Sequence, residues 1–207
     1  MKKSYPTSIY FLLTANAVPL AGVLFFGWDL IDVLFLYWAE TVIIGFYSLL
    51  KIFLAKDDDQ GWRLILTKFM RVLGCAFFII HFGGFIAAIG VALYYIVLEL
   101  FKVKVDPLEL AYMLRYALLF FILSHGYSFI FNYLLKNERN VERGQDPVIE
   151  PYRRVFVMHL TLAFGMGPVI FLGQPIYLLI ALIVMKTIAD LWSHLRERKR
   201  FRSPSFA

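Results

Sequence analysis

The chain is poor in the charged residues that keep a protein surface in water. Only 17% of its 207 residues are Asp, Glu, Lys or Arg, whereas roughly a quarter is usual in soluble domains. A single cysteine, Cys75, excludes an intramolecular disulfide and any cluster of thiolates. The chain also lacks a polar stretch long enough to form a separate soluble domain. These shortages argue against a soluble fold and favour a single domain over residues 1–207.

Hydrophobic residues are present instead, and they come in long blocks. They make up 60% of the chain, and several blocks reach the ~20 residues that cross a bilayer. We predict an all-α integral membrane protein, a six-helix bundle in one six-span domain. Residues 62–71 are amphipathic and are expected to lie at the interface before the third span turns inward. The predicted spans are residues 7–26, 30–54, 72–98, 111–135, 152–172 and 176–194.

Basic residues are distributed unevenly between the two sides of these spans. With the N-terminus in the cytoplasm, seventeen of the 21 Lys and Arg fall on the inner side, three fall on the outer side, and Lys186 lies within a span. This distribution follows the positive-inside rule and predicts that both termini are cytoplasmic. We therefore attribute the net charge of +6 to contact with membrane lipids, and we expect no nucleic-acid partner.

Ionisable side chains occur inside the predicted spans, where each costs about 3 kcal/mol or more unless it pairs or lines a cavity. Counting ~1.5 Å of rise per residue places Glu40, His81 and His125 near one mid-membrane depth on three different helices. Imidazole and carboxylate groups are common ligands of zinc, iron and manganese. These three residues are therefore the candidate ligands of a divalent metal.

A second layer of polar residues lies nearer the cytoplasm and could perform acid–base chemistry close to the lipid headgroups. With the deeper Glu40, the candidate catalytic residues are Asn132, His159, Asp190 and His194. Polar residues also recur at helical spacing, which predicts inward-facing polar stripes. The three stripes are His125, Ser128 and Asn132; Lys186, Asp190 and His194; and Tyr37, Glu40, Thr41, Ser48 and Lys51. Three glycines of span 72–98 are expected to let neighbouring helices approach closely, namely Gly83, Gly84 and Gly90.

Three classes of function stay open at this point. The first is a metal-dependent membrane enzyme that acts on a lipid-soluble small molecule at a polar site open to the cytoplasm. The second is a redox protein that binds b-type haem or a quinone, with two histidines at one level as haem ligands, either His81 with His125 or His159 with His194. The third is a non-catalytic scaffold or a transporter with a buried polar network. No Gly-x-Ser-x-Gly or His-x-x-x-His motif selects among them.

Three segments carry a resemblance to a known family. They are YWAETVIIG at residues 37–45, HFGGF at residues 81–85 and SHGYSF at residues 124–129. In these segments the chain resembles a family of uncharacterised bacterial inner-membrane proteins that is known as a domain of unknown function. The resemblance covers most of the chain and implies a small multi-pass protein of the bacterial inner membrane. It implies no activity.

Overall fold

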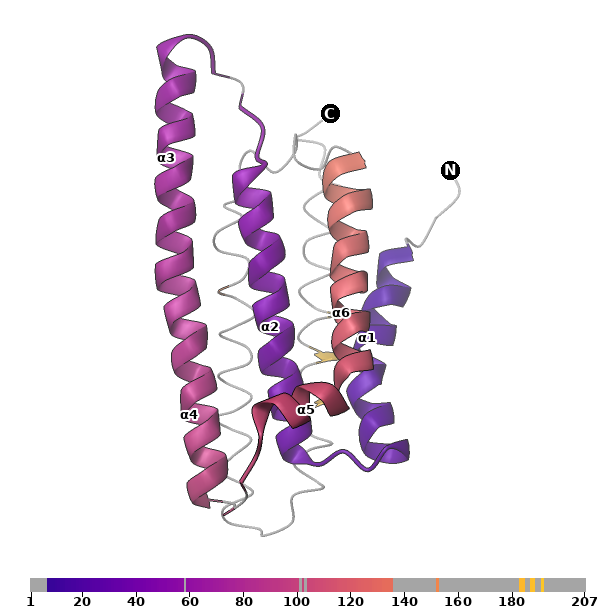
Figure 1. Cartoon of the computed structure of the whole chain (residues 1–207). Coiled ribbons are helices and arrows are strands. Elements are labelled where there is room, and N and C mark those ends of the chain that lie inside the picture. The colour runs from indigo at the N-terminus through magenta and orange to yellow at the C-terminus, as the bar shows by residue number, and fades with distance from the viewer. Residues whose placement is uncertain are drawn as a thin grey trace.

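A computed structural model of the chain describes residues 7–57, 59–100, 102, 104–135, 152, 183–184, 187–188 and 191. These residues form helices and short connections, with no strand among them. Figure 1 shows long helices side by side and one short helix across an end of the bundle. Three helices of this part of the chain are long and apolar enough to cross a membrane: Leu30–Phe53, Trp62–Tyr95 and Arg115–Leu135.

The first two helices, α1 (Thr7–Phe25) and α2 (Leu30–Phe53), form a hairpin (Figure 1). The chain turns at Gly27, whose φ of 68° lies in the left-handed region that glycine adopts without a steric penalty. Asp29 then caps α2, because its carboxylate accepts hydrogen bonds from backbone N–H groups of the first turn. Its own N–H donates to the carboxylate of Asp32 at 2.8 Å, which completes a capping box. This cap explains why α2 begins where the sequence predicts a span.

The next three elements, α3 (Trp62–Phe78), η1 (Ile79–Gly83) and α4 (Gly84–Leu100), form one uninterrupted helix. η1 is a π-helical turn, in which hydrogen bonds join residues five positions apart. The expected turn inward after residues 62–71 is wrong, because the helix keeps its direction through this stretch (Figure 1). The physical reason is that these ten residues include no proline or glycine that could bend it.

A short helix, α5 (Pro107–Met113), lies across the end of the bundle, and α6 (Arg115–Tyr127) with η2 (Ser128–Leu135) returns alongside α2 (Figure 1). Asp106 caps α5 by accepting a hydrogen bond from the backbone N–H of Leu108 at 2.8 Å. Pro107 occupies the first helical position, where a missing N–H is tolerated. The long helix α6 therefore begins at residue 115, a few residues later than the span that the sequence predicts.

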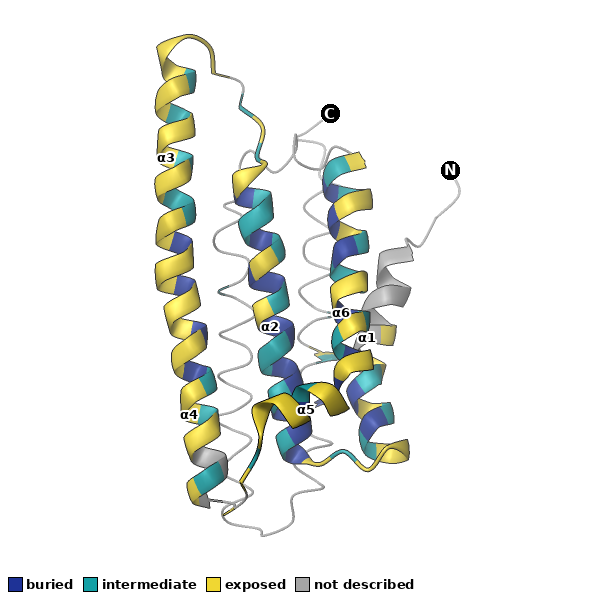
Figure 2. Ribbon diagram, in the orientation of Figure 1, coloured by how far each residue is buried: buried dark blue, intermediate teal, exposed yellow. Residues whose placement is uncertain are grey.

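Buried side chains are concentrated on α2, which contacts α3–α4 on one side and α6 on the other (Figure 2). Four of the five residues of the predicted polar face of α2 are buried, namely Tyr37, Glu40, Thr41 and Ser48. The predicted polar face of this helix thus turns inward, as expected. In contrast, most of the surface of α3 is exposed (Figure 2), which suits a helix whose apolar side chains face lipid.

Trp38 joins α2 to α4. Its indole N–H donates to the backbone carbonyl of Ile86 at 2.9 Å, and a Cβ added to Gly90 would lie 2.8 Å from the indole ring. Gly90 therefore permits the close approach that the sequence predicts. At Gly83 and Gly84 no helix of the described residues approaches closely, because a Cβ at either position would have no atom of these residues within 4 Å.

Candidate functional site

The structure brings Glu40 of α2 and His125 of α6 together. Oε1 of Glu40 lies 3.8 Å from Nε2 of His125, which is an ion pair whenever the imidazole is protonated. The Glu40 side chain is 6% exposed and the His125 side chain is 22% exposed. Because a direct N–H···O hydrogen bond spans only about 3 Å, the two groups are close without being bonded tightly. His125 is the accessible member of the pair and Glu40 lies behind it.

Both residues lie deep within their helices. Glu40 is ten residues from the start of α2 and His125 is ten residues from the start of α6, so each is about 15 Å along its helix at ~1.5 Å per residue. The two helices run in the same direction (Figure 1). The pair is therefore level in the bundle and lies near the middle of two helices that are long enough to cross a membrane.

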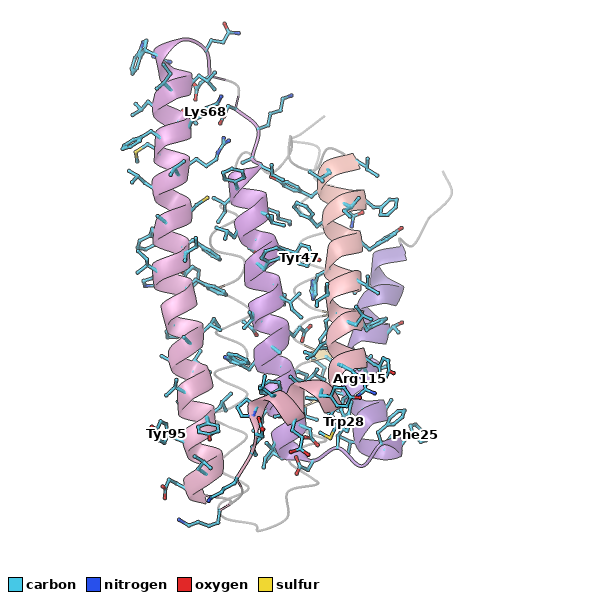
Figure 3. The ribbon with its side chains drawn as sticks, viewed as in Figure 1. Phe25, Trp28, Tyr47, Lys68, Tyr95 and Arg115 are labelled. Carbon is cyan, nitrogen blue, oxygen red and sulfur yellow. The ribbon has the colours of Figure 1, made fainter. Side chains whose placement is uncertain are left out.

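Tyr47 holds α6 in the orientation that presents His125 to Glu40. Its hydroxyl donates a hydrogen bond to the backbone carbonyl of Ile122 at 3.0 Å, and its ring centroid lies 6.5 Å from that of His125. Figure 3 shows Tyr47 pointing from α2 toward α6. Gly126 provides the space, because a Cβ there would lie 2.7 Å from the Tyr47 hydroxyl oxygen. Neither residue is among those predicted from the sequence, although a glycine directly after a histidine within a span was a usable signal.

His81 does not join this pair. It lies in η1, on the helix at the opposite side of α2 from α6, and its Nδ1 is 2.7 Å from the hydroxyl of Tyr152. Among the described residues, no group of three His, Cys, Asp or Glu side chains could hold a metal ion. The predicted three-ligand site of Glu40, His81 and His125 is therefore not formed. The three residues share a depth, but α2 lies between the two histidines, which also separates this pair as haem ligands.

The remaining candidate residues are described only in part. The amide of Asn132 donates a hydrogen bond to the hydroxyl of Ser128 at 3.3 Å, and the Asn132 side chain is half-buried on η2. Ser128 and Asn132 therefore lie on one face of the fourth span, as the predicted stripe requires. The predicted inward orientation is wrong for Ser128, because its side chain is exposed. The other candidates lie outside the described residues: His159, Lys186, Asp190 and His194.

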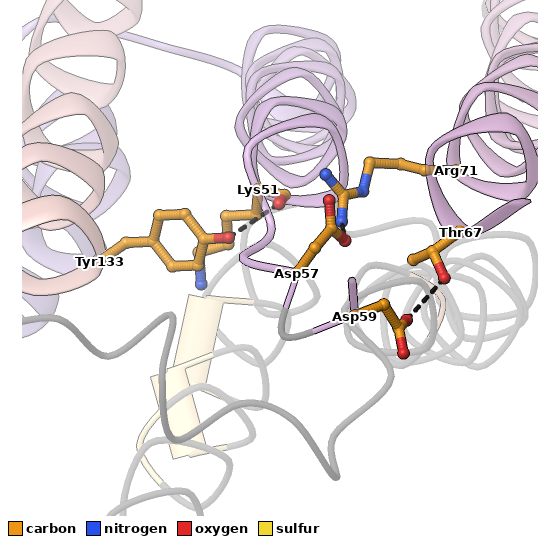
Figure 4. Close-up of polar contacts among 6 residues, drawn as sticks. All are labelled: Lys51, Asp57, Asp59, Thr67, Arg71 and Tyr133. Carbon is orange, nitrogen blue, oxygen red and sulfur yellow. Dashed lines mark hydrogen bonds and ion pairs between the residues drawn. The ribbon is translucent and has the colours of Figure 1, made fainter. Parts of the chain in front are cut away.

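Polar contacts tie the helices together at the end of the bundle where α2 finishes (Figure 4). The hydroxyl of Tyr133 donates to the backbone carbonyl of Lys51 at 2.8 Å, and the Lys51 ammonium lies 5.5 Å from the centroid of the same ring. Two further contacts join the α2–α3 connection to α3: an ion pair of Arg71 with Asp57, and a hydrogen bond from Thr67 to Asp59 at 2.7 Å. These contacts lie at the end that the sequence predicts to be cytoplasmic.

A family model described as a family of unknown function (DUF6498) matches residues 2–206. The chain belongs to this family. The match covers nearly the whole chain, so the resemblance to an uncharacterised family is confirmed at this level. No curated protein and no solved structure matches the chain. The function must therefore be argued from the side chains of the site.

Proposed function

We propose that this member of the DUF6498 family is a multi-pass membrane protein in which Glu40 and His125 perform acid–base chemistry on a lipid-soluble small molecule. The observation that carries the proposal is the pairing of a buried carboxylate with a more accessible imidazole near the middle of two apolar helices. Imidazole is the side chain best suited to exchange protons near neutral pH. A carboxylate behind it can orient the ring and stabilise its protonated form.

Energetics favour a function over simple helix packing. An ionisable group near the bilayer centre costs about 3 kcal/mol or more, and replacing a buried ion pair by apolar residues of similar volume is often neutral or stabilising. Two apolar side chains at these positions would hold α2 against α6 at least as well. A role in proton transfer therefore explains the presence of Glu40 and His125 better than helix packing does.

The exposed fractions suggest the role of each residue. His125, at 22%, is the member that would meet the substrate and donate or accept a proton. Glu40, at 6%, would act through the imidazole. Asn132 lies further along the same helix and could bind a polar group of the substrate. The proposal keeps His159, Asp190 and His194 as further catalytic residues on the cytoplasmic side.

A site for divalent zinc, iron or manganese is the second candidate, because of the same 3.8 Å separation. Two ligands of a tetrahedral ion with bonds of ~2 Å lie about 3.3 Å apart, so a small adjustment would let Glu40 and His125 share one ion. A third ligand would have to come from outside the described residues, since none of these completes such a group. Elemental analysis of the purified protein and of its His125→Ala variant tests this candidate.

The wider setting of the proposal is a six-span protein of the bacterial inner membrane with both termini in the cytoplasm. The distribution of Lys and Arg supports this topology, and the three described helices that could cross a membrane support a multi-pass arrangement. A site reached from the inner side would suit a substrate that enters from the bilayer while protons are exchanged with cytoplasmic water.

The decisive experiment compares lipid extracts of a strain that lacks the gene with extracts of strains complemented by wild-type or variant protein. We expect wild-type protein to restore at least one lipid-soluble species that Glu40→Gln and His125→Gln do not restore. Ser48→Ala is the matched control, because Ser48 is a buried polar residue on the same face of α2. Full restoration by His125→Gln, with all proteins present at equal levels in the membrane, would refute acid–base chemistry at this pair.

A further inference from the structure

A second polar site lies on the other side of α2 and does not involve the Glu40–His125 pair. Its centre is His81, an exposed residue in the middle of η1. The His81 ring stacks on Phe77 with centroids 5.1 Å apart and ring planes 16° apart. Its Nδ1 lies 2.7 Å from the hydroxyl oxygen of Tyr152, whose ring packs edge-on against Phe78 and Phe82. The imidazole is thus held by two aromatic side chains.

The contact with Tyr152 occupies Nδ1 of the imidazole and leaves Nε2 for another partner. When the phenol hydroxyl donates to Nδ1, the ring proton of neutral His81 is on Nε2. No described residue forms a hydrogen bond with Nε2. In this tautomer His81 presents an N–H donor at the exposed surface of a helix that is long and apolar enough to cross a membrane. Lipid tails cannot accept this hydrogen bond. A suitable partner is therefore a molecule that dissolves in the membrane and has a hydrogen-bond acceptor.

The depth of His81 restricts the chemistry of that partner. His81 is nineteen residues from Trp62 and fourteen from Tyr95, which places it more than about 20 Å from either end of this helix at ~1.5 Å per residue. The ester and phosphate oxygens of phospholipids lie outside a hydrocarbon core that is about 30 Å thick. A phospholipid is therefore a poor partner, and a molecule with a carbonyl oxygen inside the hydrocarbon core is a better one.

We propose that His81, Tyr152 and Phe77 bind the head of a lipid-soluble quinone. A quinone combines a flat ring, a carbonyl oxygen that accepts a hydrogen bond, and an apolar tail that stays in the membrane. Gly84, three residues after His81, leaves room for the ring at this level of the helix, because a Cβ added there would meet no atom of the described residues within 4 Å. The π-helical turn at His81 is consistent with a binding role, since such turns occur frequently at functional sites.

Photolabelling tests this proposal. Full-length protein in phosphatidylcholine nanodiscs is labelled with an azido-quinone, with and without excess decylubiquinone, and the labelled peptides are mapped. We expect competable labelling of peptides that include residues 77–84. His81→Leu should lower this labelling about tenfold, as the loss of one hydrogen bond near 1.4 kcal/mol predicts. Tyr152→Phe should lower it several-fold, and His81→Gln, which keeps an N–H donor, should retain an intermediate level.

Two controls make the result specific to His81. Ile80→Ala changes a neighbouring side chain that is 76% exposed and apolar, so labelling should stay at the wild-type level. Glu40→Gln should also leave labelling unchanged, which separates failure of this proposal from failure of the acid–base proposal. Labelling of folded His81→Leu and His81→Gln at the wild-type level would overturn quinone binding at this site. Wild-type labelling that excess decylubiquinone does not reduce would overturn it as well.

Discussion

At the scale of single residues, Gly126 controls the contact between α2 and α6. An alanine there would place its Cβ 2.7 Å from the Tyr47 hydroxyl oxygen, which would push Tyr47 away from the carbonyl of Ile122. We predict that Gly126→Ala lowers the free energy of unfolding by about 1–3 kcal/mol, the usual cost of overpacking. Denaturation in mixed detergent micelles measures this change. Gly84→Ala is the control and should be near neutral, because a Cβ at Gly84 has no atom of the described residues within 4 Å.

The second prediction at this scale concerns the pairing of Glu40 with His125. We predict that His125→Leu lowers the free energy of unfolding by about 1–3 kcal/mol, because it leaves a buried carboxyl group without this partner. Replacing both residues by Leu should recover most of the loss, since an apolar pair needs no partner. A double-mutant cycle in the same detergent system measures the coupling. Additive losses in the double variant would contradict the assigned pairing.

The candidate site could be predicted from the sequence only in part, and the reason is geometric. Counting residues from the ends of a span estimates depth, and by this measure Glu40, His81 and His125 are equivalent. It does not determine the direction around the helix axis, which changes by about 100° with each residue. Tyr47 and Gly126 set that direction for His125, while Tyr152 engages His81 on the other side of α2. The equal depth of Glu40 and His125 was therefore predictable from the sequence. Their separation from His81, which leaves the three-ligand site unformed, was not.

At the scale of elements, hydrophobicity predicts the positions of helices better than their ends. α2 begins and ends within a residue of its predicted span, because a cap at Asp29 and a mostly apolar sequence specify it together. The helix that contains η1 begins ten residues earlier than the predicted span, since nothing between residues 62 and 71 interrupts it. The start of α6 was missed because Pro107 and Asp106 initiate a separate short helix first.

The length of the helix Trp62–Tyr95 leads to a third prediction. Its 34 residues extend about 50 Å at ~1.5 Å per residue, whereas the hydrocarbon core is about 30 Å thick. Its first turns should therefore project from the membrane, where Arg63 is exposed. In a Cys75→Ala background, a cysteine in place of Arg63 should react with a membrane-impermeant maleimide added to inverted membrane vesicles. A cysteine in place of Ile80 should not react, and equal labelling of the two positions would show that the first turns are buried in lipid.

At the scale of the whole molecule, the directions of the described helices agree with the distribution of charge. α2 and α6 run one way and the helix between them in sequence runs back (Figure 1). Asp106, before α5, therefore lies at the end of the bundle opposite to Lys51 and Leu135. The end with Lys51 also includes the α2–α3 connection and the contacts of Arg71 and Thr67 (Figure 4). This is the end where the positive-inside rule places the cytoplasm.

Reporter fusions at three positions test this arrangement. We predict that alkaline phosphatase, which is active only outside the cytoplasm, is active when fused after Asp106 and inactive when fused after Asp146. Green fluorescent protein should give the reverse result, because the chain crosses the membrane once between these positions if Arg115–Leu135 is a span. A fusion after Gln60, in the α2–α3 connection, is the internal control and should match Asp146, since the two crossings between Gln60 and Asp146 return the chain to the same side. If Asp106 and Asp146 report the same side, α6 does not cross the membrane, because it is the helix that lies between these two positions. The fusion after Gln60 then tests the α3–α4 helix: the same side as Asp106 would show that this helix does not cross either, whereas the opposite side would show that it crosses and that α6 alone does not.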